Sequence, residues 1–171
     1  MDRIRRLSRM ARTLGMIGLV ILVPFTTVTI GSFFFSKEAN WEFYGKQIPL
    51  ANVSMSVRVS AALDILFRGG IGIWVVWNGV QLFKKFEVGI LFAAETIKHF
   101  RRIATGLLAS GVYTTLATCF LGLLFPPLYR QQPPIGVHIN LDLILIGTGL
   151  LAISWVMEEA RKLRETQDLV I

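Results

Sequence analysis

Four apolar stretches, each long enough to cross a lipid bilayer as a helix, divide this chain of 171 residues. They occupy residues 13–35, 60–83, 103–125 and 141–157. A helix rises ~1.5 Å per residue, so the ~30 Å hydrocarbon layer needs ~20 residues, and the shorter fourth stretch just spans it. The sequence therefore predicts an all-α membrane protein, a four-transmembrane-helix bundle that forms a single domain over residues 1–171.

Basic residues alternate between the segments that separate these stretches. The segment before residue 13, the connection 84–102 and the tail 158–171 together hold thirteen Lys and Arg residues, whereas the connections 36–59 and 126–140 hold four. Short loops rich in Lys and Arg are retained in the cytoplasm. Both termini are therefore predicted to be cytoplasmic, and residues 36–59 form the largest extracytoplasmic loop.

The composition supports a membrane protein and disfavours a nucleic-acid-binding one. A hydrophobic fraction of 53% and a mean hydropathy of +0.58 are too apolar for an ordinary soluble domain. The net charge of +7 lies in short flanks of the apolar stretches, where the anionic inner leaflet is the nearer partner. We therefore expect the lipid bilayer as a partner and no direct contact with nucleic acid.

Charged side chains inside the apolar stretches form the nearest thing to a site. Asp64 and Arg68 lie one helical turn apart on one face of the second stretch, and Asp142 stands near the start of the fourth, at a similar shallow depth. Ionisable groups in membrane helices mark ligand, ion or proton sites. Asp64, Arg68 and Asp142 are thus a candidate polar cluster. The open alternative is a structural salt bridge with one carboxylate among the headgroups.

Two short segments alternate apolar and polar residues with the period of a strand. They are residues 53–59 and 137–143, and both precede a span on the outer side. A two-stranded extracytoplasmic β element formed by these segments would satisfy their backbone groups. The alternative is irregular chain that enters a helix.

Motifs of catalysis and metal binding are absent from the sequence. It contains no HExxH, GxSxG or CxxC motif and no phosphate-binding glycine loop. The two histidines, His99 and His138, fall on opposite sides of the membrane in the predicted topology. We therefore expect no enzyme, no catalytic or metal-binding residue and no cofactor. Glycines such as Gly69 and Gly147 predict close helix approach, either within one chain or in a homo-oligomer.

The cytoplasmic segments carry the more specific pattern. A helix is predicted to begin near Ala93 with Glu95 in its first turn, and the tail continues the fourth helix with Glu158–Lys162 and Arg161–Glu165 spaced four apart. This tail either binds a partner or is a solvated helix end that anchors the topology. The candidate partner-binding residues are Glu95, Arg101, Arg102, Arg161, Arg164, Glu165, Gln167 and Asp168.

Residues 89–108 (GILFAAETIKHFRRIATGLL) and 158–171 (EEARKLRETQDLVI) resemble the bacterial inner-membrane family catalogued as domain of unknown function 2975. That family has four spans, a cytoplasmic motif between the second and third, and a characteristic ending. The matching positions are Gly89, Phe92, Glu95, Phe100, Arg101 and Ile103 in the loop, and Leu163, Arg164, Glu165, Gln167, Asp168, Leu169 and Val170 in the tail. Ala93 departs from the pattern, because the family tends to have a capping Ser or Thr there.

The resemblance implies a multi-pass protein of the bacterial inner membrane without an established activity. Members of the family are often thought of beside small helix-turn-helix regulators. This implies a regulatory or interaction protein whose cytoplasmic loop and tail bind such a regulator. The alternative is a small transporter or a sensor of a membrane-accessible ligand that uses the polar cluster.

Overall fold

A computed structural model describes residues 2–36, 40–43, 46–49, 54–89, 93–124 and 140–168. The chain forms, in order, α1 (Asp2–Phe35), β1 (Asn40–Phe43), β2 (Lys46–Pro49), α2 (Met55–Glu87), α3 (Ala94–Leu124) and α4 (Leu141–Asp168). Each predicted span lies inside one helix, except for residue 125, which is outside the described residues. The prediction of helices at these four places is confirmed.

The helices continue past the apolar stretches at one end of the molecule. The basic N-terminal segment belongs to α1, and α4 runs through the charged tail. α2 ends in a turn in which Gly89 adopts a φ of 83°, a left-handed conformation that glycine enters without strain. α3 begins beside Ala93, whose carbonyl accepts hydrogen bonds from the amides of Thr96 (3.0 Å) and Ile97 (3.2 Å). The predicted helix start is therefore confirmed, although residue 93 has no capping side chain.

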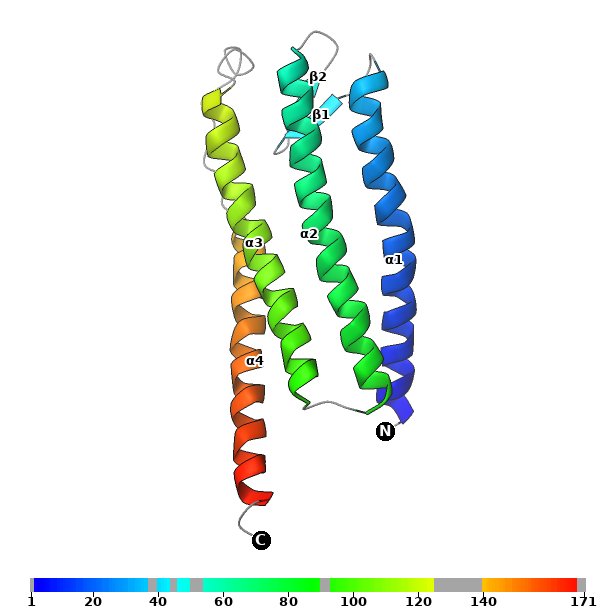
Figure 1. Ribbon diagram of the computed structural model, residues 1–171, viewed down its shortest axis with the longest axis vertical. Helices are drawn as coiled ribbons and strands as arrows, with labels where there is room; N and C mark the ends of the chain where they lie inside the picture. Colours follow the sequence, from blue (N-terminus) through cyan, green and yellow to red (C-terminus); the bar gives the residue numbers. More distant parts are fainter. Residues whose placement is uncertain are drawn as a thin grey trace.

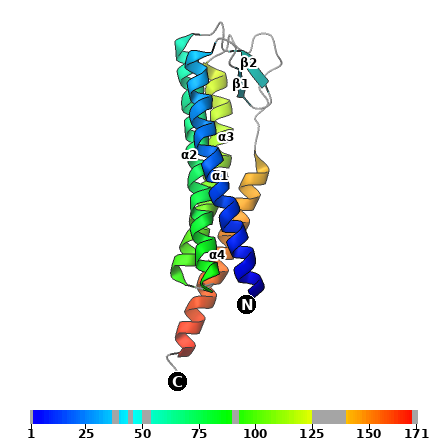
Figure 2. The same ribbon diagram turned by 90° about the vertical axis from the view of Figure 1, so that its right-hand side faces the viewer.

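The helices pack in the order of the chain and alternate in direction. α1 packs on α2, α2 on α3, and α3 on α4, and these are the extensive contacts between helices. Figures 1 and 2 show the resulting row, with both termini at the same end. An even number of antiparallel helices returns the chain to the end where it began.

Close approach at the helix contacts depends on glycine. A Cβ atom at Gly69 would lie 2.4 Å from Cγ2 of Thr26 on α1. A Cβ atom at Gly147 would lie 3.1 Å from both the carbonyl oxygen of Ala104 and the amide nitrogen of Leu108 on α3. Both contacts are inside one chain, as expected for small residues at membrane helix interfaces.

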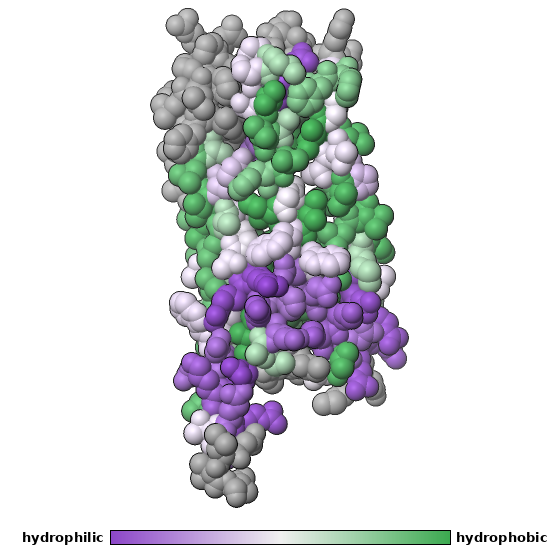
Figure 3. Space-filling view, in the orientation of Figure 1, coloured by the Kyte–Doolittle hydropathy of each residue, from purple (hydrophilic) through white to green (hydrophobic). Residues whose placement is uncertain are grey.

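Large apolar side chains cover the outer faces of the helices. On α1, Val20 is 73% exposed and Val28 70% exposed, and on α4 Val156 is 69% exposed. In Figure 3 hydrophobic residues form the middle of the molecule, and hydrophilic ones gather toward the end that carries the termini. Among the described residues, α1, α2 and α4 are long and apolar enough to cross a membrane. The crossing of α3 stays a prediction.

The predicted pairing of residues 53–59 with 137–143 is wrong for the residues that the structure describes. Residues 55–59 form the first turns of α2, and residues 141–143 begin α4. Ser54 occupies the N-cap position of α2 with an extended backbone, so the period-two pattern was the entry to a helix. The two-stranded antiparallel sheet that does form lies within one loop and pairs Asn40 with Pro49 and Phe43 with Lys46. Its two strands are close in sequence, so the conformational entropy lost on closing the loop between them is smaller than for the predicted distant pair.

Candidate functional site

Asp64 is the most buried charged side chain among the described residues, with 2% of its side chain exposed. Nη2 of Arg68 lies 2.7 Å from Oδ2 of Asp64, and Nε of Arg68 donates a hydrogen bond to Oδ1 (3.0 Å). The hydroxyl of Tyr113 on α3 donates to the same Oδ1 (3.0 Å), and its ring lies 4.4 Å from that of Phe67. The structure brings together Asp64 and Arg68, as expected, and adds Tyr113.

Asp142, the third member of the candidate polar cluster, is exposed in the first turn of α4. A carboxylate suits that position, because the amino end of a helix carries a partial positive charge. Oδ1 of Asp64 already accepts hydrogen bonds from a guanidinium and a phenol, and Oδ2 forms the ion-pair contact with Nη2 of Arg68. This arrangement is what a structural pair requires, since burial of a charge is tolerated only when a partner compensates it.

A second buried polar contact joins α2 to α3 closer to the termini. The Asn78 amide, 3% exposed, donates to the carbonyl of Trp74 (2.8 Å), and its Oδ1 lies 3.1 Å from Nδ1 of His99. Burial lowers the pKa of His99, and the nearby cations Arg102 and Lys85 lower it further. A buried amide in a membrane helix was a signal for such a contact, but the sequence alone did not indicate its partner.

Ion pairs join every pair of neighbouring helices at the end that carries the termini. Glu87 of α2 binds Arg9 (3.0 Å) and Arg12 (2.9 Å) of α1. Lys85 of α2 binds Glu95 of α3 and holds the pKa of that carboxyl below its usual range. These pairs are partly or largely exposed, so each contributes little to stability.

The candidate partner-binding residues divide into two groups. Glu95 and Arg101 belong to the first group, because each forms an ion pair within the fold. Glu95 pairs with Lys85 of α2, and Arg101 pairs with Glu158 of α4 (2.8 Å). Arg161 pairs with Glu165 as its spacing predicts, whereas the expected Glu158–Lys162 pair is replaced by Glu159–Lys162 (3.4 Å). Glu158 turns to α3 because the two helices pack there. The side chains of Arg102, Arg164 and Gln167 are exposed, and that of Asp168 is not described.

The last turns of α4 project beyond the ends of the other helices (Figure 1). Residues 162–167 are all exposed, and they include the apolar side chain of Leu163, 60% exposed. Among the described contacts, Leu163 and Arg164 form no side-chain hydrogen bond or ion pair. Leu163 and Arg164 are therefore exposed side chains that the described fold does not use.

No three His, Cys, Asp or Glu side chains come together as a metal ion would require in the part of the chain that the structure describes. A hollow of about 230 Å³ lies where α3 begins beside α4, and Lys98, Arg101, Glu158 and Arg161 contribute to its lining. Its chemistry suits anions or acidic side chains more than metal ions.

Comparison with known protein families gives a match over most of the chain. The model of a family described as a protein of unknown function, DUF2975, matches residues 52–171, which contain α2, α3 and α4. No curated protein and no solved structure matches the chain.

Proposed function

Since this chain belongs to the DUF2975 family of proteins of unknown function, we propose that it is a membrane adaptor that binds a regulatory protein at its cytoplasmic face. In this proposal all four helices cross the bacterial inner membrane and both termini lie in the cytoplasm. The partner is a small helix-turn-helix regulator, as the family resemblance implies. The adaptor itself performs no chemical step and does not contact nucleic acid.

The projecting end of α4 carries this proposal. Its side chains do not support the fold, because residues 162–167 are exposed and lie beyond the other helices. A helix end that only anchors the topology in water would need charged side chains alone, yet Leu163 presents an apolar surface on this segment. Arg164, which stands beside Leu163, can add a charge-assisted hydrogen bond to an acidic group of the partner.

The cytoplasmic orientation has support from charge. The termini, the turn between α2 and α3 and most Lys and Arg residues are at one end of the molecule (Figures 1 and 3). Segments rich in these residues remain on the cytoplasmic side during insertion. A cytoplasmic regulator would therefore meet the projecting helix.

Co-purification of the detergent-solubilised chain from its native membrane tests the proposal. We expect a helix-turn-helix protein to be recovered with the unaltered chain and to be lost with Leu163→Glu or after deletion of residues 161–171. Lys84→Gln is the matched control, because it alters an exposed cation at the same end but on α2. Recovery that persists without residues 161–171 would contradict the docking surface, and absence of any such regulator would contradict the adaptor.

A further inference from the structure

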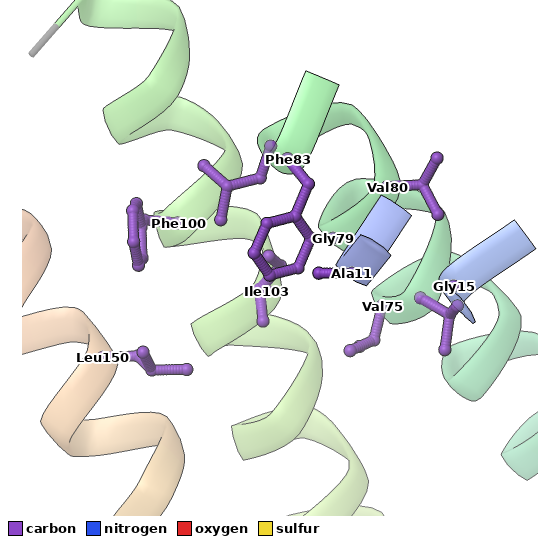
Figure 4. Close-up of a pocket in the computed structure, with 11 residues that line it drawn as sticks. Ala11, Gly15, Val75, Gly79, Val80, Phe83, Phe100, Ile103 and Leu150 are labelled. Carbon is purple, nitrogen blue, oxygen red and sulfur yellow. The ribbon is translucent and has the colours of Figure 1, made fainter. Parts of the chain in front are cut away.

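An apolar pocket of about 340 Å³ lies between all four helices (Figure 4). Its volume is within the ~300–1,000 Å³ typical of small-molecule sites. The lining includes Ala11 of α1, Phe83 of α2, Phe100 and Ile103 of α3, and Leu150 of α4. The extensive helix contacts join chain neighbours only, so an occupant of this pocket would also bridge α1 and α4.

The depth of the pocket favours a lipid chain as this occupant. Lys84 follows Phe83 and Arg102 precedes Ile103, so the pocket begins where the charged end of the molecule stops. If the apolar helices span a bilayer, this depth is the outer part of the hydrocarbon layer, directly below the headgroups. Acyl chains are the abundant apolar molecules at that depth.

The charges beside the pocket favour an anionic headgroup. Every carboxylate whose side chain is described at this end binds a cation within the chain, namely Glu87, Glu95, Glu158, Glu159 and Glu165. Six exposed cations at this end of the molecule have no ion pair among the described contacts, and they are Arg5, Arg6, Lys84, Lys98, Arg102 and Arg164. Of these, Lys84 and Arg102 adjoin the lining residues Phe83 and Ile103 in the chain. Surplus cations at a membrane surface attract anionic lipid, at ~1 kcal/mol per Lys or Arg.

We infer that this pocket binds one acyl chain of an anionic glycerophospholipid whose phosphate pairs with Lys84 and Arg102, the two surplus cations that adjoin lining residues in the chain. Lipid chains are already in hydrocarbon when unbound, so burial from water does not select the ligand. Selection comes from packing against Phe83, Phe100 and Leu150 and from the charge of the headgroup. The inference depends on the membrane placement of the helices and is independent of a bound regulator.

Gly79 provides a way to fill the pocket. It lines the cavity, and a Cβ atom there would meet nothing within 4 Å, so we expect a larger side chain at this position to occupy part of the cavity. Gly70 is the matched control, because it lies on the same helix, also faces open space and does not line the pocket. Gly79→Leu should exclude the acyl chain, and Gly70→Leu should not.

Native mass spectrometry of the full detergent-solubilised chain measures the effect. Phosphatidylglycerol and phosphatidylcholine with identical acyl chains are added in turn. We expect the unaltered chain and Gly70→Leu to retain one phosphatidylglycerol in preference to phosphatidylcholine. We expect Gly79→Leu to retain about tenfold less, since the excluded part of the acyl chain loses its packing contacts with the lining residues. Equal retention by Gly79→Leu and Gly70→Leu would overturn the pocket as the site.

Two further measurements keep the inference testable if Gly79→Leu folds poorly. Phosphatidylglycerol with a photoreactive group on its acyl chain should label Phe100, Ile103 and Leu150 of the unaltered protein more strongly than Val20 and Val28, which face outward on α1. Even labelling of both sets would overturn the site. Lys84→Gln combined with Arg102→Gln should reduce the preference for phosphatidylglycerol over phosphatidylcholine. An unchanged preference would overturn the role of the cations.

Discussion

Two buried polar contacts join α2 to α3 among the described residues, and they differ in kind. Toward one end the Tyr113 hydroxyl binds the carboxylate of Asp64, which Arg68 neutralises. About 21 Å further along α2, at ~1.5 Å per residue, the His99 imidazole binds the amide of Asn78. The first contact contains buried charge and the second contains neutral dipoles.

The difference predicts unequal consequences when each contact is broken. Removal of one member of a buried ion pair leaves an uncompensated charge, whereas loss of a neutral hydrogen bond costs far less. The carboxylate contact should therefore determine whether α2 and α3 stay together. The amide contact should determine only how tightly they close near the termini.

Arg68→Met should have the largest effect. It leaves the Asp64 carboxylate, 2% exposed, with Tyr113 as its described hydrogen-bond donor from α3. We expect the free energy of unfolding to fall by about 3–5 kcal/mol, measured by circular dichroism in mixed micelles. The variant that combines Asp64→Asn with Arg68→Gln contains no charge at this place and should lose less.

Two results would break this account. If Arg68→Met is as stable as the double variant, the carboxylate does not need its partner. If the double variant is stable but the cell loses a transport or sensing response, the polar cluster is functional and the alternative transporter or sensor gains support.

Gly106 lies on α3 between the two contacts, and its substitution should have an intermediate effect on stability. A Cβ atom there would lie 2.5 Å from Cγ2 of Val75 and 2.9 Å from Cζ3 of Trp74. Gly106→Ala should therefore destabilise the protein by about 1–3 kcal/mol through overpacking, measured by the same unfolding titration. Gly70→Ala is the control, because a Cβ atom there meets nothing within 4 Å and helix propensity alone should raise stability by up to about 1 kcal/mol. Equal stabilisation by both changes would show that α2 and α3 pack less closely than this.

The positions of the helices could be predicted from the sequence because they depend on residues that are close together in the chain. Apolar length predicted the four helical places, and the spacing of Asp64 and Arg68 predicted their ion pair. The strand predicted at residues 55–59 is wrong because a short alternating segment fits a strand or a helix entry equally well until its hydrogen-bond partners are known.

Contacts between helices could not be predicted in the same way. Tyr113 reaches Asp64, and His99 reaches Asn78, only because α3 packs on α2 in one rotation and at one height. Glu158 was expected to pair along its own helix, but packing placed Arg101 beside it. Asp142 was expected at a depth similar to that of Asp64, but depth alone does not bring two helices together.

The smallest expected effect on folding stability comes from the protonation of His99 as pH falls. The Asn78 amide nitrogen donates to Trp74, so its Oδ1 accepts, and Nδ1 of His99 therefore carries the hydrogen that joins them. Protonation occurs at the other ring nitrogen and adds a charge that burial, Arg102 and Lys85 all disfavour, with Glu95 opposing them. The pKa of His99 is thus lower in the folded state than its ordinary 6.5. The unfolded chain binds the proton more readily than the folded chain does. The stability that neutral His99 contributes is therefore complete above pH 6.5 and is lost as pH falls through the lower folded pKa.

Hydrogen exchange at the amides around Asn78 and around Asp64, followed across that pH range, measures whether the two contacts are independent. Exchange near Asn78 should rise as the solution is acidified, because the folded state disfavours the charge that protonation adds to His99, while exchange near Asp64 stays unchanged. His99→Gln should remove this pH dependence, because an amide can donate to Asn78 without acquiring a charge. If both places open together, α2 and α3 separate as one unit, and the two contacts are parts of a single cooperative interface rather than a strong and a weak one.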